Sequence, residues 1–496
     1  MSLPNSLRPH PHLYEINTWA WLETLSANAG RRIALADVPD TEWDRIARDG
    51  FDVVWLMGLW QRSEESRRIA QADEGNRAEY DRALPGWKPG DVIGSPYAVT
   101  DYAPDPRIGT WDALDLVREK LHARGIGLFA DFVGNHTALD HSWTHEHPEY
   151  YVQGGAEDFQ KSPVDFFKVV TSQGEKYIAR AHDLYCPAWK DAAQLNYFHP
   201  ATREAQIGVL RTIAGHCDGV RCDMAMLQLT DIFEKIWSRY LKGAAAPKNE
   251  FWEEANAAVP RLTLLAEAYW GTEQRLLDLG FSFAYDKDLY DAVKDERAEE
   301  IHARLEANVE YQSRLARFLE NHDEQRRAVV FSDARLSAAG TLMGTLPGMR
   351  FYYQGELEGL RHHLPITLRI AAPEPPDAYC SAFFEKILRL TNEDVFHRGR
   401  WTLLEIASEG DATSSNLIGF EWRTEKSWKL IAVNIAQNTS QGRVKLGDRV
   451  RADLNYSFHD ELNEVIYPRE GCELHDVGLF VRLDAGQAHI FDITPA

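Results

Sequence analysis

Short apolar runs alternate with longer segments of helical periodicity between residues 13 and 356. Runs of this kind, bounded by turn residues, are typical of strands buried on both faces of a parallel sheet. The segments 110–125 and 201–216 repeat apolar residues every three or four positions and begin at a threonine or at alanine-threonine, which predicts helices. The predicted strands cover residues 13–21, 51–60, 126–136, 218–226, 262–270, 281–286, 315–323 and 348–356.

This alternation of eight strands with helices predicts an α/β fold, a (β/α)8 TIM barrel. The spacing of three acidic residues at the ends of predicted strands agrees, since a barrel of about 250 residues devotes roughly 31 residues to each βα unit. Asp223 and Glu267 lie 44 positions apart, which fits one unit with an extended loop. Glu267 and Asp323 lie 56 positions apart, which fits two units.

Two interruptions and a late change of pattern divide the chain further. Residues 61–95 form a polar excursion, and the stretch after the third strand is too long for a plain loop, which predicts an inserted subdomain. Beyond a helical segment at 381–394, short alternating runs predict an antiparallel β domain. We therefore expect a barrel of residues 1–136 and 195–396, an inserted subdomain of 137–194 and a C-terminal all-β domain of 397–496.

Charge and composition narrow the class of partner. The 54 basic and 76 acidic residues give a net charge of −22, a field that repels nucleic acid and anionic membranes. This charge fits a neutral substrate, and it equally fits simple solubility. The 15 tryptophans suit stacking on sugars or bases, and they suit a large core just as well.

The start of the chain and its cysteines predict a cellular compartment. Residues 1–21 lack a basic segment followed by an apolar one, so we expect no signal peptide, and no window approaches the roughly 18 apolar residues of a membrane span. The five cysteines are odd in number and form no CxxC pair. Reduced thiols in the cytoplasm are the simplest explanation.

The stretch "CDGVRCDMAM", residues 217–226, places an arginine and an aspartate two positions apart in an apolar run. Side chains alternate between the faces of a strand, so Arg221 and Asp223 share a face and Cys222 points to the other. The pair is either a buried structural ion pair or part of an active site.

Further polar residues stand at the predicted carboxyl ends of strands, where barrels of this kind carry their active sites. Burying unpaired charge is costly, so a barrel shaped only for stability would not gather charges there. These residues are Asp131, Asn135, His136, Arg221, Asp223, Glu267, Asn321, His322 and Asp323.

Four segments in order carry a resemblance to a known family. "DFVGNH", "GVRCD", "LLAEAYW" and "FLENHD" resemble the four signatures of glycoside hydrolase family 13, the α-amylase family. Weaker similarities are found in "GSPYAVTDY" (94–102), "QLNYFHP" (194–200) and "GMRFYYQGE" (348–356). The resemblance covers essentially the whole chain and implies a retaining enzyme that acts on α-glucosidic bonds.

The resemblance also implies catalytic roles. Asp223 corresponds to the family's nucleophile, and Arg221 would keep that carboxylate ionised by holding its pKa down. Glu267 corresponds to the general acid/base, whose apolar flank would help it to keep its proton. Asp323 corresponds to the third carboxylate, which binds sugar hydroxyls and helps to distort the ring.

Substrate-binding residues follow from the same comparison. His136 and His322 would hydrogen-bond the hydroxyls of one sugar, and Tyr97 would stack beneath it. Asp131 either supports the site or takes part in it. Asn135 is interpreted as loop scaffold, and Glu356 as either structural or substrate-binding.

Two observations bear on metals. His136, His141, His145 and His147 suggest a zinc site, but they lack the i, i+4 pairing with a companion acid, so a solvated loop is the preferred interpretation. Calcium-dependent relatives have a histidine four residues after the nucleophile, where this chain has Leu227. Asn135 retains one ligand position, the shared calcium site is in doubt, and we expect no required cofactor.

The sequence thus predicts hydrolysis of malto-oligosaccharides or related α-glucosides through a covalent glycosyl–Asp223 intermediate. A transglycosylase or isomerase that uses the same intermediate is the alternative. A non-catalytic carbohydrate-binding relative and a metal-dependent barrel hydrolase are the further classes. Met224 stands where relatives often have a small residue, so substrate choice is not predicted, and neither is the oligomeric state.

Overall fold

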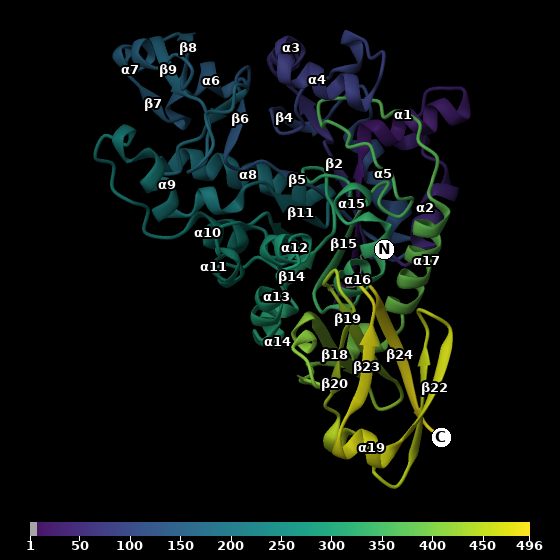
Figure 1. Cartoon of the computed structure of the whole chain (residues 1–496). Coiled ribbons are helices and arrows are strands. Elements are labelled where there is room, and N and C mark those ends of the chain that lie inside the picture. Colours follow the sequence, from purple (N-terminus) through teal and green to yellow (C-terminus); the bar gives the residue numbers. More distant parts are fainter. Residues whose placement is uncertain (1–6) are drawn as a thin grey trace.

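The computed structural model describes residues 7–496 and contains a closed barrel of eight parallel strands (Figure 1). Each predicted strand overlaps one barrel strand, which confirms the predicted fold class. The first six residues of the stretch that was expected to carry no signal peptide lie outside the described residues. The barrel strands are β1 (His12–Asn17), β2 (Val53–Met57), β5 (Gly127–Phe132), β11 (Gly219–Cys222), β12 (Thr263–Ala266), β13 (Phe283–Tyr285), β14 (Leu315–Arg317) and β15 (Met349–Tyr353).

Closure of the barrel depends on the first strand, because β1 pairs in parallel with both β2 and β15. Going round the barrel, the order is β1, β15, β14, β13, β12, β11, β5 and β2. In β11, Arg221 lies opposite Asp131 of β5 and Leu265 of β12. This register places Arg221 between β5, which carries Asp131, and β12, which Glu267 directly follows.

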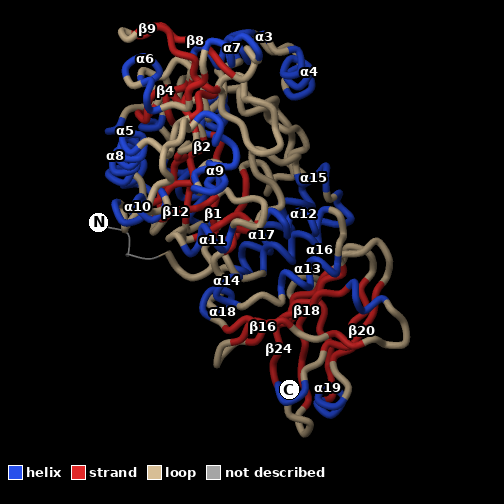
Figure 2. The backbone as a smooth tube through the Cα atoms, turned by 90° about the vertical axis from the view of Figure 1, so that its left-hand side faces the viewer, coloured by secondary structure: helices blue, strands red, loops and turns tan. Residues whose placement is uncertain are grey.

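Helices cover the outside of the barrel (Figure 2). The helices predicted at 110–125 and 201–216 are α5 (Trp111–His122), whose N-cap Thr110 accepts the N–H of Ala113, and α8 (Pro200–His216), which begins at a proline. The further helices of the barrel part are α1 (Thr18–Ala29), α2 (Asp40–Arg48), α9 (Thr230–Trp237), α10 (Phe251–Ala258), α11 (Glu273–Asp278), α12 (Lys287–Lys294), α13 (Ala298–Leu305), α14 (Val309–Gln312), α15 (Arg327–Val330), α16 (Ser332–Thr345), α17 (Ala378–Thr391) and α18 (Val395–Arg398).

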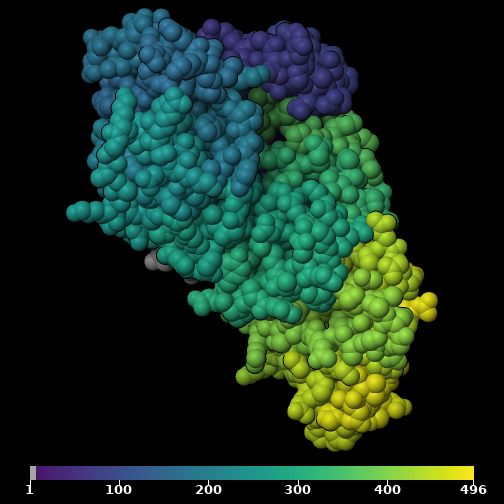
Figure 3. All heavy atoms as spheres, turned by 60° about the vertical axis from the view of Figure 1, so that its left-hand side comes forward, coloured from purple at the N-terminus to yellow at the C-terminus, as the bar shows by residue number. Residues whose placement is uncertain are grey.

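Two excursions lie at one end of the barrel (Figure 1). The first, after β2, contains β3 (Trp60–Arg62), α3 (Glu64–Ala72), α4 (Glu74–Ala83) and β4 (Val99–Pro104). The second begins at β6 (His136–Ala138) and returns at β10 (Ala192–Gln194), and these two strands pair antiparallel. Between them lie α6 (Trp143–Glu146), β7 (Gln153–Gly154), α7 (Ala156–Lys161), β8 (Phe166–Thr171) and β9 (Gly174–Ala179), with the sheet order β7–β9–β8. Figure 3 shows a hollow where the second excursion faces the first.

The C-terminal part consists of two antiparallel sheets at the opposite end of the barrel from the excursions (Figures 1 and 2). One sheet has the order β16–β18–β19–β24–β21–β22 and the other β17–β20–β23. Trp422 fixes this part to the barrel, since its indole N–H donates to the carbonyl of Thr345 in α16 at 2.7 Å. The elements are β16 (Arg400–Leu403), β17 (Ile406–Ala407), β18 (Leu417–Arg423), β19 (Trp428–Asn434), β20 (Ser440–Val444), β21 (Asn455–Asp460), β22 (Val465–Glu470), α19 (Gly471–Asp476), β23 (Leu479–Leu483) and β24 (Ala488–Pro495).

The inserted subdomain and the antiparallel C-terminal domain are therefore present, as predicted, whereas the domain boundaries stay a prediction. No helix within residues 7–496 combines the length and the apolar character that crossing a bilayer requires. All five cysteines are free thiols.

A glycine at the entrance of β15 gives a test of this packing. Gly348 has a φ of 104°, and a Cβ there would lie 2.2 Å from the carbonyl oxygen of Leu315 in β14. Gly348→Ala should therefore lower the free energy of unfolding by at least about 2 kcal/mol, measured as a fall in the calorimetric midpoint. Gly125→Ala is the matched control, because Gly125 has a φ of 77° but nothing within 4 Å. Equal shifts for the two variants would contradict the steric explanation.

Candidate active site

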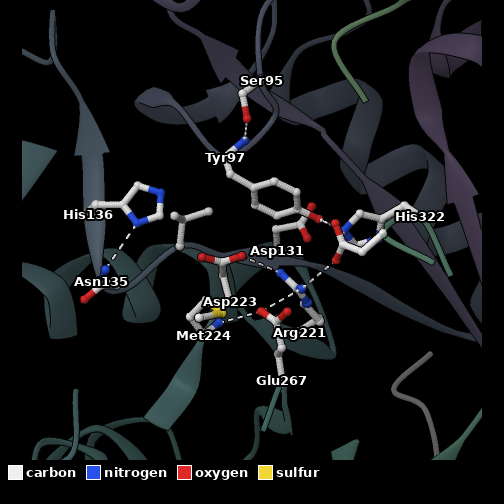
Figure 4. Close-up of polar contacts among 12 residues, drawn as sticks. Ser95, Tyr97, Asp131, Asn135, His136, Arg221, Asp223, Met224, Glu267 and His322 are labelled. Carbon is white, nitrogen blue, oxygen red and sulfur yellow. Dashed lines mark hydrogen bonds and ion pairs between the residues drawn. The ribbon is translucent and has the colours of Figure 1, made fainter. Parts of the chain in front are cut away.

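Three carboxylates and one arginine meet at the carboxyl ends of the barrel strands (Figure 4). Asp223 directly follows β11, Glu267 directly follows β12, and Asp323 lies in the loop after β14. Arg221 contacts all three: its Nη1 lies 2.8 Å from Asp223 Oδ1, and its Nη2 lies 2.8 Å from Glu267 Oε2 and 3.8 Å from Asp323 Oδ2. The shared face predicted for Arg221 and Asp223 is thus present, and it opens onto two further carboxylates.

The backbone around these residues is shaped to present them. Met224 has a φ of 43°, in the left-handed region that a non-glycine residue rarely adopts. In this conformation its N–H donates to Glu267 Oε2 at 2.6 Å. In the loop after β14, Asn321 Oδ1 accepts the N–H groups of Asp323 and Glu324, each at 2.9 Å, which forms the turn that carries the third carboxylate.

Two opposing effects act on the pKa of Asp223. Burial raises the pKa of Asp223 above its ordinary value, and the favourable interaction with Arg221 offsets this only in part. Asp323 adds to the rise, because a second negative charge nearby disfavours ionisation. Arg221 thus lowers this pKa, as expected from the sequence, but desolvation, which the sequence argument did not consider, outweighs it.

Glu267 lies in the environment that its apolar flank predicted. Its side chain is 4% exposed, and burial raises its pKa to about 7, against the opposing effect of Arg221. The hydroxyl of Tyr269 donates to Glu267 Oε1 at 2.7 Å. A carboxyl group with such a pKa holds a proton through much of the neutral range and can release it.

His322 lies on the side of the site opposite His136 (Figure 4), and Asp323 contacts it there. Burial raises the pKa of Asp323, but the interactions with His322 and Arg221 more than compensate, so its pKa falls to about 2. Nε2 of His322 lies 3.0 Å from Asp323 Oδ2 and 2.6 Å from the Tyr97 hydroxyl. The Tyr97 ring also stacks on the His322 ring, at 5.4 Å between centroids. The Cζ of Arg221 lies 5.2 Å from the centroid of the Tyr97 ring.

His136 lies on the other side of Asp223 (Figure 4). It begins β6, it is buried, and Trp189 from the end of the inserted segment lies 5.1 Å from it between ring centroids. Burial lowers the pKa of His136 to about 4, so its imidazole is neutral at neutral pH. The side-chain oxygen of Asn135 accepts a hydrogen bond from Gln194 Nε2 at 3.0 Å, which agrees with a scaffold role for Asn135.

Asp131 and Glu356 have different surroundings. Asp131 Oδ2 accepts the N–H of Gly58 at 2.9 Å, its Oδ1 has no hydrogen-bond partner, and burial raises its pKa to about 6. Glu356 accepts the N–H of Tyr353 at 3.1 Å, and burial and the neighbouring Glu320 raise its pKa. Asp131 thus contacts the backbone just after β2, whereas Glu356 belongs to a separate buried cluster with Glu320.

The donor groups do not fit the metals considered. Leu227 is buried and apolar and offers no ligand atom, so the histidine ligand of calcium-dependent relatives is not reproduced, and the Asn135 oxygen accepts a hydrogen bond from Gln194. Within residues 7–496, no three His, Cys, Asp or Glu side chains are grouped as a metal site. Of the four histidines suggested for zinc, His145 contacts a backbone oxygen of β8 and His147 contacts Glu149, while His136 lies in the active site.

Sequence reasoning missed several residues of the site. Glu15 in β1 contacts His322, Tyr269 contacts Glu267, and Trp189 covers His136. Glu15 did leave a signal, because it is an acidic residue inside the apolar run "LYEIN". Tyr269 and Trp189 left none, since aromatic residues are frequent throughout this chain.

Comparisons with known proteins agree with this geometry. The family model described as "Alpha amylase, catalytic domain" matches residues 44–365. The chain is similar to Alpha-amylase 3 of Dictyoglomus thermophilum, with 25% identity over 291 residues that cover 54% of each chain. It is also similar to the trehalose synthase/amylase TreS of Mycobacterium tuberculosis, with 30% identity over 128 residues, 24% of this chain and 21% of that one.

The match to these curated relatives thus spans about half of their length or less. Among solved structures, the maltogenic α-amylase AmyB of Thermotoga neapolitana has the same fold, with a TM-score of 0.68 and 18% identity over 97% of this chain and 98% of that one. Because the family match covers more than half of the chain and the site contains the residues of all four signatures, the protein is an enzyme of the α-amylase family, glycoside hydrolase family 13.

Proposed function

We propose that the protein is a retaining glycosidase that acts on the α-glucosidic bonds of malto-oligosaccharides or related α-glucosides. The observation that carries the proposal is the sharing of one guanidinium by Asp223 and Glu267, each at 2.8 Å. A retaining enzyme needs a carboxylate and a carboxylic acid close together, on the two sides of the scissile bond. The pKa of about 7 for Glu267 supports its role as the acid.

The reaction proceeds in two displacements. In the first, a carboxylate oxygen of Asp223 bonds to the anomeric carbon while the bond to the leaving oxygen breaks, and Glu267 gives that oxygen its proton. In the second, Glu267 takes a proton from water or a sugar hydroxyl, whose oxygen bonds to the anomeric carbon and releases Asp223. Glu267 thus regains its proton, and the anomeric configuration is retained.

The remaining residues bind and orient the sugar. Asp323 lies at the open mouth with the buried His322 beside it, and both hydrogen-bond the sugar hydroxyls, as His136 does from the opposite side. Tyr97 offers its ring to the apolar face of the same sugar. Arg221 remains bound to both reacting carboxylates and fixes their separation.

Hydrolysis is the leading version, and transfer or isomerisation through the same intermediate is the alternative. The similarity to the trehalose synthase/amylase TreS supports keeping that alternative. A purely carbohydrate-binding relative is less favoured, because all three carboxylates are in contact with Arg221. We further propose that no metal takes part in the reaction, because the donor set around Leu227 does not fit one. We also propose that the enzyme works in the cytoplasm, where five free thiols are stable.

Removing either reacting group tests the assignment. Asp223→Asn should lower kcat on maltotriose by at least about 10³-fold, and Glu267→Gln by about 10²–10⁴-fold, with calorimetric midpoints close to that of the wild type. Asp112→Asn and Glu119→Gln, on the exposed face of α5, are the matched controls. Near-normal turnover in either active-site variant would contradict the roles assigned to Asp223 and Glu267.

The pH dependence should identify Glu267 as the acid. With a sugar leaving group, kcat/KM should fall as the pH rises through about 7, because the carboxyl group loses the proton that it must donate. With α-glucosyl fluoride this alkaline fall should be absent, since fluoride leaves without protonation. The same alkaline fall with both substrates would assign the titration to another group.

Product analysis separates hydrolysis from transfer. Maltose, maltotriose, trehalose, sucrose, isomaltose and starch are incubated separately, and product sizes are followed over time. We expect products shorter than the substrate, with the first product in the α configuration. Products longer than the substrate, or an isomer of the disaccharide, would favour the transferase or isomerase instead.

A further inference from the structure

A fully buried acidic residue lies directly behind the binding histidine. Glu15 Oε1 lies 2.5 Å from His322 Nδ1, and both side chains are 0% exposed. The second oxygen of Glu15 has no hydrogen-bond partner, so the contact with the imidazole is the main one available to this carboxylate. Burying an acidic side chain is costly unless it is paired, so Glu15 requires an explanation beyond packing.

His322 therefore lies between two carboxylates. Nδ1 faces Glu15, and Nε2 faces Asp323 at 3.0 Å, with the Tyr97 hydroxyl at 2.6 Å. An ionised carboxylate only accepts hydrogen bonds, and an imidazole donates from both nitrogens only when it is protonated. Burial raises the pKa of Glu15 above its ordinary value, and His322 offsets this rise only in part. When Glu15 and Asp323 are both ionised, an imidazolium can donate to both of them and a neutral ring cannot.

The other charged groups around His322 come from several strands. Asp131 of β5 and Asp223 after β11 interact favourably with an imidazolium, while Arg221 of β11 is the neighbouring cation and is itself held by three carboxylates. Trp55 of β2 packs edge-on against the ring at 5.6 Å, and Nε2 of His363 lies 3.1 Å from the His322 carbonyl oxygen. The carboxylates outnumber the cations. The pKa of His322 is accordingly raised well above 6.5: burial lowers it, and Asp323 and Glu15 more than compensate.

We propose that Glu15 is a positioning residue that holds His322 as an imidazolium, so that Nε2–H remains a hydrogen-bond donor to Asp323 and to the substrate throughout the neutral pH range. Asp323 then remains ionised and oriented toward the sugar. The catalytic consequence rests on the proposed function, whereas the protonation state of His322 does not.

Removing the charge of Glu15 should make His322 neutral in the neutral pH range. In Glu15→Gln, an amide that can both donate and accept replaces a group that only accepts, so a neutral imidazole is accommodated. Burial then favours the neutral form. Glu15→Asp retains the charge and is the conservative control.

Nuclear magnetic resonance of protein labelled in the histidine rings tests the protonation directly. The His322 signal is assigned by its loss in His322→Asn. In the wild type it should keep its imidazolium shift from about pH 6 to pH 9, in Glu15→Gln it should titrate within or below that range, and in Glu15→Asp it should stay protonated. A wild-type titration near 6.5 would overturn the proposal even if Glu15→Gln did not fold, and so would a Glu15→Gln signal that remains protonated.

The pH profile on α-glucosyl fluoride tests the consequence, because this substrate needs no protonation of its leaving group. Above the new imidazole pKa, kcat/KM of Glu15→Gln should fall to a lower plateau, because the neutral ring no longer supplies the positive charge that keeps Asp323 ionised and oriented, while the wild type and Glu15→Asp show no such fall. A uniform loss at every pH would show that Glu15 acts only through packing, and the proposal would be wrong. Inactivity of the wild type on every α-glucoside would refute the proposed function, and the resonance experiment would still decide the state of His322.

Discussion

The site depends on one buried cation. Arg221 is 1% exposed, and the free energy cost of placing a guanidinium in the barrel is offset by the carboxylates that contact it. Its planar fork lets two different nitrogens bind two different carboxylates, which a lysine would not do with the same geometry. Because β11 holds Arg221 in register with β5 and β12, the barrel wall determines the separation of Asp223 and Glu267.

The carboxylates around Arg221 differ in pKa because their surroundings differ. Glu267 lies deep beside Tyr269 and keeps a proton, with a pKa of about 7, whereas Asp323 lies at the open mouth beside His322, with a pKa of about 2. Two groups of the same chemical type can thus serve as proton donor and as fixed anion. The difference comes from burial and neighbours, and both are set by the loops after the strands.

Much of this arrangement could be predicted from the sequence. Buried strands are continuous apolar runs, so all eight barrel strands were found, and the signature motifs brought Arg221, Asp223 and Glu267 to one mouth. The pKa of Asp223 could not be predicted, because it depends on how desolvation compares with a single ion pair. The roles of Glu15 and of the Met224 backbone were also missed, since periodicity describes neighbours along one strand and not contacts across a barrel or a left-handed φ.

The contact between Glu15 and His322 joins residues that are 307 positions apart in the chain, one in the first barrel strand and one beyond the seventh. Contacts between residues so far apart in sequence form late in folding, because the entropy cost of closing a long loop comes before the contacts stabilise the structure. During synthesis β1 is made early, and nearly two thirds of the chain must follow before Glu15 can contact His322. The binding face of this enzyme is therefore completed only when the barrel closes, so enzymatic activity during refolding reports on the last step of assembly and not on the formation of the individual strands.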